Sequence, residues 1–165
     1  NEISVNSFKL VVARLSVLTG LTGNEQFKLE EKKLMIGDGT AAIFRQVIDG
    51  IALAQSNHMT VDKNGSILNL STFSLPAEVQ RSRVLINPQS AIEHTQIEWE
   101  AKYNKKAPRI VLQTPLDLQY KLTSEDILEP YYEFKFSVEG DPSNWYFSQV
   151  NATSGKTKVS RIFSD

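Results

Sequence analysis

The strongest constraint on this chain is a strict alternation of apolar and polar side chains that begins after Pro130. Tyr132, Phe134, Phe136 and Val138 occupy every second position, and mainly polar side chains separate them. Successive side chains of a β-strand point to opposite faces, so this period of two predicts a strand with one buried face and one wet face. Any fold for this chain must therefore include a sheet that is covered on one side.

The segments around this strand predict its partners. Residues 110–122 alternate in the same way, with apolar side chains at the even positions except Thr114. They predict one long strand, in which Pro115 marks a bulge or an edge position because proline has no N–H for a ladder. After a polar loop at 139–144, we expect two further strands at residues 145–150 and 156–163, joined by a turn at 151–155. Three or four consecutive strands predict an antiparallel meander.

The clearest helix signal covers Pro88–Tyr103. Asn87 can cap the first turn, and Pro88 suits the first helical position, where no N–H is needed. The stripe expected to be buried consists of Ile92, Thr95, Trp99 and Tyr103. This segment is therefore predicted to pack as a helix against the meander.

Two further helices are predicted in the first half. One follows the turn at 37–40, and its stripe is formed by Phe44, Val47, Ile48, Ile51 and Gln55. The other spans residues 8–18, with Ser7 as its cap and Gly20 as its stop, although its valines suit a strand equally well. Residues 25–36 fit a strand or a short helix, and residues 59–73 predict a hairpin with its turn at 62–65.

These elements predict an α+β fold in which helices pack on one face of an antiparallel sheet. The predicted helix-then-strand unit at 41–73 is echoed at 88–122, which suggests two related modules. We expect an N-terminal α+β module at 1–83, a candidate degenerate copy, and a C-terminal module at 84–165.

Charge and composition exclude several chemistries. The 165 residues include no cysteine, which removes disulfides, thiolate catalysis and cysteine-ligated metals. Eighteen basic and 19 acidic side chains give a net charge of −1, which argues against nucleic acid as a partner. His58 and His94 stand in no metal-binding or catalytic spacing. We therefore expect no catalytic residue, no metal site and no cofactor.

Two loops resemble ligand-binding motifs but have plainer explanations. Residues 37–40 lack the lysine of a phosphate-binding loop, so they are interpreted as the turn that enters the predicted helix. Residues 62–66 resemble the start of a calcium loop, yet apolar residues follow where further carboxylates are required. They are interpreted as a hairpin turn.

Aromatic side chains cluster in the predicted meander. Alternation sends about half of them into the core. The candidates for contact with a partner are Tyr131 and one face of the Trp145–Tyr146 pair, because exposed aromatic rings anchor interfaces at little entropic cost.

Several phrases of the second half resemble the PepSY family. They are Ile86–Ile92, which opens the helix, Glu129–Phe134, and the hairpin phrase Gln149–Lys156. Together they are most similar to extracytoplasmic regulators of a Gram-positive sensor kinase, the YycI and YycH type. This resemblance covers residues 84–159 and implies a non-enzymatic, membrane-anchored protein built from related α+β modules.

The resemblance leaves three functions open. The first is an extracytoplasmic interaction domain at a bacterial cell membrane that modulates a membrane protein, such as a sensor kinase of a two-component system or a related regulator. Because the chain begins with Asn, we expect an excised or processed segment whose anchor lies upstream of Asn1. The second is a secreted or anchored PepSY-type module that binds peptides or inhibits a peptidase. The third is an enzyme with a cryptic site, in which His58 or His94 lies beside a carboxylate.

Overall fold

A computed structural model describes residues 9, 10, 13, 27–34, 39–64, 66–106 and 109–162. The chain divides into two compact units, Asn1–Val79 and Gln80–Asp165. Both contain antiparallel sheet, and a helix packs on the sheet of the second unit, so the α+β class is confirmed. Of the helix expected at residues 8–18, only residues 9, 10 and 13 are described, and they are helical; its other residues lie outside the described part, as do Gly37 and Asp38.

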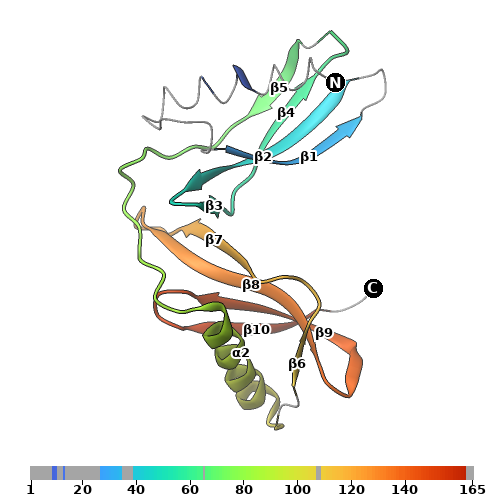
Figure 1. The fold of residues 1–165 in the computed structure, drawn as a ribbon, viewed down its shortest axis with the longest axis vertical. Coiled ribbons are helices and arrows are strands. Elements are labelled where there is room, and N and C mark those ends of the chain that lie inside the picture. The colour runs from blue at the N-terminus through green and yellow to red at the C-terminus, as the bar shows by residue number, and fades with distance from the viewer. Residues whose placement is uncertain are drawn as a thin grey trace. The chain divides into compact units, whose positions relative to one another are not determined.

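The described part of the first unit is an antiparallel sheet centred on β2. Its strands are β1 (Phe27–Leu34), β2 (Thr40–Ile48), β3 (Ile51–Leu53), β4 (Asn57–Val61) and β5 (Ile67–Ser71). Strands β1, β3 and β4 pair with β2, and β5 extends the sheet beyond β4 (Figure 1). The segment that fitted a strand or a short helix therefore adopts the strand form, as β1.

The helix predicted from Phe44 to Gln55 is wrong, because most of that segment forms β2 and β3. Alternate side chains of β2 are buried, and they are Thr40, Ala42, Phe44, Gln46 and Ile48. The stripe was misleading because Ile43 and Val47 stand on the other, half-buried face while polar Gln46 is buried. The helix-then-strand echo that suggested a duplication therefore has no helix at this position, and residues 39–40 lead into a strand.

A missed turn signal lies between these two strands. Asp49 and Gly50 both have positive φ values, 51° and 76°, which suits a two-residue turn of a tight hairpin. Asp-Gly is one of the pairs that favour such a turn. The Asp-Gly dipeptide therefore indicates a hairpin turn here, whereas the apolar spacing wrongly indicated a helix.

Two buried amide side chains attach the end of the first unit to its sheet. The Gln46 side chain donates to the Leu75 carbonyl at 2.8 Å and accepts from the Leu75 N–H at 2.8 Å. Asn57 Oδ1 accepts from the Phe73 N–H in the same way. Because an unpaired buried amide is costly, these contacts explain how polar residues can occupy core positions of β2 and β4.

The predicted hairpin of the first unit is confirmed as β4 and β5. Asp62 Oδ1 accepts from the N–H groups of Asn64 at 2.8 Å and Ser66 at 2.9 Å. This is the local bonding by which Asp stabilises a turn. The turn interpretation of residues 62–66 therefore describes this loop.

The second unit is a sheet centred on β8, with one helix on its face. Its elements are α2 (Pro88–Tyr103), β6 (Ile110–Leu112), β7 (Asp117–Leu122), β8 (Leu128–Val138), β9 (Asp141–Asn151) and β10 (Thr157–Ile162). Strand β9 pairs with one side of β8, β6 and β7 share its other side, and β10 pairs with β9. Figure 1 shows α2 crossing this sheet. The predicted meander is confirmed.

The signals predicted for the start of α2 are confirmed. Asn87 Oδ1 accepts from the Ser90 N–H at 2.8 Å, and Pro88 occupies the first turn. Asn104 closes the helix in the left-handed region with φ 50°. Local sequence therefore determines where this helix begins and ends.

Two predicted boundaries in the second unit are wrong. The long strand over 110–122 is two strands, because the chain leaves the ladder at 113–116, where Pro115 cannot donate. The polar loop over 139–144 is only a turn at Glu139 and Gly140, since β9 already begins at Asp141. Gly140, with φ 86°, allows this tight reversal.

The helix attaches to the sheet through one buried stripe, Ala91, Thr95 and Trp99. Thr95 Oγ1 donates to the Ala91 carbonyl at 2.9 Å and lies 2.7 Å from Ser148 Oγ on β9. Around this buried hydroxyl pair lies an apolar core, whose β8 members are Tyr132, Phe134, Phe136 and Val138. The alternating apolar side chains of β8 therefore form the surface on which α2 packs.

We expect Gly155→Ala to destabilise the second unit more than Gly140→Ala. Both glycines have positive φ, 79° and 86°, so each alanine incurs about 1–2 kcal/mol from the left-handed backbone. A Cβ at Gly155 would also lie 3.0 Å from His94 Nε2 and 3.0 Å from Ile86 Cδ1, whereas a Cβ at Gly140 meets nothing within 4 Å. This crowding should add roughly 1 kcal/mol or more.

Chemical denaturation of both variants measures the difference. Equal free energies of unfolding for Gly155→Ala and Gly140→Ala would show that the His94 and Ile86 side chains move aside without loss of stability.

Candidate functional site

Two depressions flank α2, and the first lies at the C-terminal end of the helix. We call it the aromatic cleft. It has a volume of about 330 Å³ and is lined by Trp99, Tyr103, Lys105, Lys106, Val138, Glu139, Gly140, Asp141 and Tyr146. Helix α2 supplies the first two, the end of β8 supplies Val138, and the β8–β9 turn and β9 supply the last four. The tight turn at Glu139–Gly140 therefore brings both walls together.

Three aromatic rings form the apolar part of this cleft. The Trp99 ring lies 5.3 Å from that of Tyr103 and 5.8 Å from that of Tyr146, and the two tyrosine rings are 5.3 Å apart. The Trp99–Tyr146 pair is perpendicular at 89°, which is a favourable edge-to-face arrangement. Burial raises the pKa of Tyr103, so its hydroxyl is neutral near pH 7.

The indole N–H of Trp99 is the unusual polar group of this cleft. Trp99 is 4% exposed, and its buried Nε1 has no hydrogen-bond partner among the described residues. A buried donor without a partner costs roughly 1–3 kcal/mol. This donor therefore requires an explanation.

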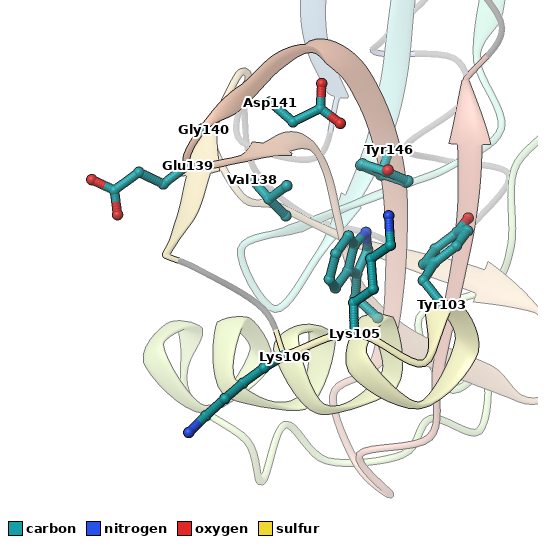
Figure 2. Close-up of a pocket in the computed structure, with 9 residues that line it drawn as sticks. Tyr103, Lys105, Lys106, Val138, Glu139, Gly140, Asp141 and Tyr146 are labelled. Atoms are coloured by element: carbon teal, nitrogen blue, oxygen red, sulfur yellow. The ribbon is translucent and has the colours of Figure 1, made fainter.

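The charged groups around the cleft divide into two sets. Figure 2 shows Lys105 extending toward Tyr146, whereas Lys106 and Glu139 point away from the cleft. The Asp141 carboxylate accepts hydrogen bonds from Asn144 at 2.7 Å and Ser143 at 3.0 Å. The hydrogen bond from Asn144, followed by that from Ser143, lowers the pKa of Asp141. The Asp141 carboxylate therefore stays negatively charged, and its own turn supplies two of its hydrogen-bond donors.

The second depression, which we call the α2–β6 groove, lies between the helix and the first short strand of the second unit. It has a volume of about 640 Å³ and is lined by Gln89, Ile92, Gln96, Arg109, Ile110, Val111, Leu112 and Glu139. Its apolar side includes Val111 and Leu112, which are 41% and 42% exposed. Glutamine amides and one charge of each sign complete its lining.

Backbone bonding places β6 at an edge. The Glu139 N–H donates to the Arg109 carbonyl at 2.8 Å, and the Gln113 N–H donates to the Lys135 carbonyl at 2.8 Å. In an antiparallel ladder the bonded residues alternate, so residues 109, 111 and 113 turn their backbone groups toward β8.

The intervening residues of β6 face the other way. Ile110 and Leu112 therefore turn their N–H and carbonyl groups to the outer edge, with which no strand of the described chain pairs. An edge of this kind is a template for another strand. The groove thus combines an apolar surface with a row of available backbone groups.

The three predicted partner contacts lie in different environments. Trp145 is 41% exposed, and its Nε1 donates to the Pro142 carbonyl at 3.2 Å. Tyr131 is half-buried. Tyr146 is only 6% exposed and belongs to the core beneath α2, so it offers a partner little surface outside the aromatic cleft. Contact of Trp145 and Tyr131 with a partner stays a prediction.

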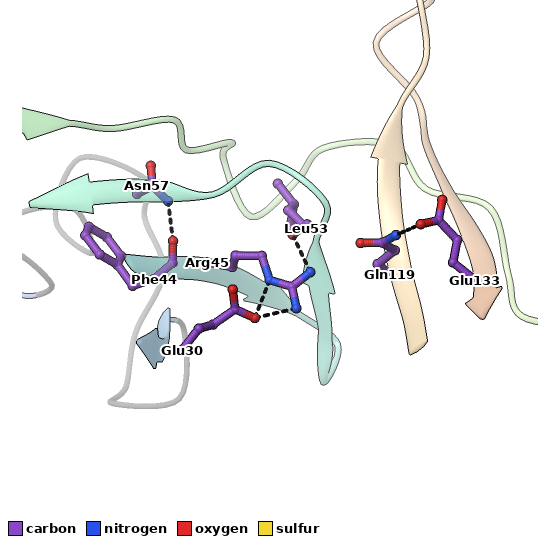
Figure 3. Close-up of polar contacts among 7 residues, drawn as sticks. All are labelled: Glu30, Phe44, Arg45, Leu53, Asn57, Gln119 and Glu133. Carbon is purple, nitrogen blue, oxygen red and sulfur yellow. Dashed lines mark hydrogen bonds and ion pairs between the residues drawn. The ribbon is translucent and has the colours of Figure 1, made fainter. Parts of the chain in front are cut away.

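Tyr131 belongs to a polar network on β8 and its neighbours. Its hydroxyl donates to Glu129 at 2.9 Å, and burial followed by this bond raises its pKa. On the same face, Glu133 accepts from the amides of Gln119 at 2.5 Å and Gln149 at 2.7 Å (Figure 3 shows the first). The wet face of β8 is therefore an ordered polar surface.

The two histidines lie in different units. His58 Nε2 is 3.3 Å from Ser56 Oγ on the first unit, and the His94 ring packs near Gly155 in the second. Among the residues described, no group of three or more His, Asp or Glu side chains is arranged to hold a metal ion. Within the same residues, no helix has the length and apolar character needed to cross a bilayer.

Sequence reasoning missed the two features that define these depressions. Trp99 was predicted to lie in the buried stripe of α2, but nothing in the sequence marks its N–H as unpaired. The outer edge of β6 is set by its pairing with β8, and Pro115, which marks a bulge or an edge position in the expected long strand, was the one available signal.

No protein-family model matches the chain, and no curated protein matches it. Among solved structures it is similar to the Bacillus megaterium YpeB C-terminal domain, at 14% identity and a TM-score of 0.41. The match covers 96% of this chain and 65% of that chain. A likeness at this TM-score carries no inference about function, so the elements described above define the fold class.

We expect Asn144→Ala to raise the pKa of Asp141 toward its ordinary value of 3.8, and Ser143→Ala to raise it less. The hydrogen bond from Asn144 lowers the pKa of this carboxylate more than the hydrogen bond from Ser143 does. Because the folded pKa lies below the unfolded one, the stabilisation is present above the unfolded pKa and is lost as pH falls through the folded pKa.

Carboxyl ¹³C NMR titration of the wild type and both variants measures these shifts. A larger shift in Ser143→Ala than in Asn144→Ala would reverse the order of the two causes.

Proposed function

We propose that this chain is a non-enzymatic protein-interaction domain that binds an extended segment of its partner along the outer edge of β6. The observation that carries this proposal is the α2–β6 groove, where the outward backbone groups of Ile110 and Leu112 adjoin exposed apolar side chains. Addition of a strand to a sheet edge obtains affinity from the backbone and specificity from alternate side chains.

The lining of the groove favours a segment of mixed character. Val111 and Leu112 provide apolar contacts, and Gln89 and Gln96 lie on the helix side. Arg109 and Glu139 carry opposite charges at the end where β6 begins. The partner segment is therefore an extended peptide with apolar side chains and a polar or charged end, rather than a uniformly apolar surface.

The non-enzymatic assignment is supported by the positions of the histidines. The His94 ring lies near Gly155, and His58 lies on β4, between β2 and β5, beside Ser56. Neither arrangement resembles a general base that a carboxylate orients. The interaction role accounts for the described geometry without catalysis.

The cellular setting of this domain rests on the PepSY resemblance. The phrases that carry it lie at the start of α2, on β8 and at the β9–β10 hairpin, in the order helix, strands, hairpin. We propose an extracytoplasmic domain of a regulator anchored in a Gram-positive cell membrane, whose partner is a sensor kinase or a related regulator. A peptidase held through its own extended segment is the alternative that the same strand edge favours.

The first experiment selects linear peptides from a random display library on the wild-type chain. A synthetic copy of the tightest peptide is then tested against Leu112→Pro and Leu112→Thr. Proline removes the outward N–H without touching the ladder to β8, and an edge position tolerates it. We expect Leu112→Pro to weaken binding roughly three- to ten-fold, the effect of one backbone hydrogen bond. Leu112→Thr keeps the N–H and should lose less.

Amide exchange provides the second measurement. Bound peptide should slow exchange at Ile110 and Leu112, and both variants should unfold at nearly the wild-type denaturant midpoint. If no selected peptide protects these amides, or if Leu112→Pro binds as the wild type does, the strand-edge proposal is wrong.

A membrane pull-down tests the finer assignment. The wild-type chain and Leu112→Pro are used as baits on solubilised membranes of a Gram-positive bacterium. The regulator proposal expects a sensor kinase that the wild type retains and the proline variant loses. Retention of a peptidase whose activity falls on binding supports the alternative, and recovery of no membrane protein contradicts the regulator role.

A further inference from the structure

We infer that the aromatic cleft is a second, separate binding site, which takes the carboxylate of a ligand that has an apolar or aromatic body. This site is distinct from the outer edge of β6. It is formed by the end of α2, the β8–β9 turn and β9, and its donors are Trp99 Nε1 and Lys105 Nζ.

The first support is the unpaired indole N–H. Trp99 lines the cleft, and only 4% of its surface is exposed. Its Nε1 has no acceptor among the described residues. The indole nitrogen is a donor only, so the group that satisfies it must supply an acceptor atom. A ligand oxygen meets this requirement.

The second support is the distribution of charge. Lys105 extends into the cleft toward Tyr146, and it forms no ion pair with any residue that the structure describes. Glu139 points away, and the negative charge of Asp141 is balanced in part by hydrogen bonds from Asn144 and Ser143 and by the positive charge of Arg161, all of which lower its pKa. The available positive charge therefore favours an anionic acceptor over a neutral one.

The third support is the wall of the cleft. Tyr103, Tyr146 and Trp99 present aromatic surface, and Val138 adds an aliphatic contact. A volume of about 330 Å³ lies at the small end of the range for sites that bind small molecules. The ligand body is therefore compact and apolar, as in an aromatic amino-acid carboxylate or the last residue of a peptide.

Access of a ligand to the indole N–H requires a side chain of the cleft to move. Nε1 is shielded in the unliganded cleft, and Lys105 is an exposed, unbranched side chain whose reorientation costs little. A carboxylate that attracts the Lys105 ammonium group changes the position of this side chain within the cleft. Binding and exposure of the Trp99 N–H are thus coupled.

The indole N–H signals in ¹H–¹⁵N NMR spectra test this site directly. The chain has two tryptophans, and Trp145→Phe assigns the signal of Trp99 by elimination. The probes are N-acetyl-L-phenylalanine, its neutral amide, and phenethylamine as a cation of similar size. We expect the acid to move the Trp99 indole proton downfield in a saturable way, and the amide and the amine to bind at least several-fold more weakly.

Two lysine variants separate a specific contact from a general field. Lys105→Met should weaken binding of the acid about two- to five-fold, as expected for loss of one partly exposed ion pair. Lys106 points away from the cleft, so Lys106→Met should weaken it less. Equal losses in the two variants would contradict a specific role for Lys105.

Three results would overturn the inference as a whole. They are an unchanged Trp99 signal with the acid at up to ~10 mM, which is weaker than any useful affinity, equal binding of the acid and its amide, and tighter binding of phenethylamine. None of these measurements involves the β6 edge. A failure here therefore leaves the proposed peptide groove standing, and failure of the groove leaves this site standing.

Discussion

The packing of α2 on the sheet of the second unit is the interaction on which both depressions depend. Three side chains one helical turn apart, Ala91, Thr95 and Trp99, are buried against the sheet, and the Thr95–Ser148 hydroxyl pair fixes their position. A small residue, a hydrogen-bonded residue and a large aromatic residue make successive contacts along one line. With the helix packed in this way, the α2–β6 groove lies along one side of α2 and the aromatic cleft lies at its C-terminal end.

Strand β8 provides the surface to which α2 attaches. It pairs with β9 on one side and with β6 and β7 on the other, so its backbone is satisfied along its length. One face presents Phe134 and Phe136 to the helix, and the opposite face carries the Glu133 amide network. Both faces of β8 are ordered, and the two depressions lie at the margins of the sheet, where β6 ends the ladder and the β8–β9 turn meets α2.

Local signals predicted the second unit well, and the reason lies in particular residues. Asn87 and Pro88 define the start of α2, and the Tyr132-to-Val138 alternation defines β8, because each effect acts within a few residues. The first unit was harder to predict. Strand β2 has apolar side chains on both faces and buried Gln46, whose amide is satisfied by Leu75, 29 residues away. A distant partner of this kind cannot be seen in a local pattern, and the segment therefore resembled a helix.

The sequence by itself determined the α+β class, the bounds of α2 and the absence of cysteine chemistry, because propensity, capping and alternation are local properties of the chain. Only the tertiary structure decided where binding can occur. The unpaired N–H of Trp99 depends on which atoms surround it, and the outward groups of Ile110 and Leu112 depend on the register between β6 and β8. Both result from contacts between segments that are far apart in the chain, so the same residues read in order do not reveal them.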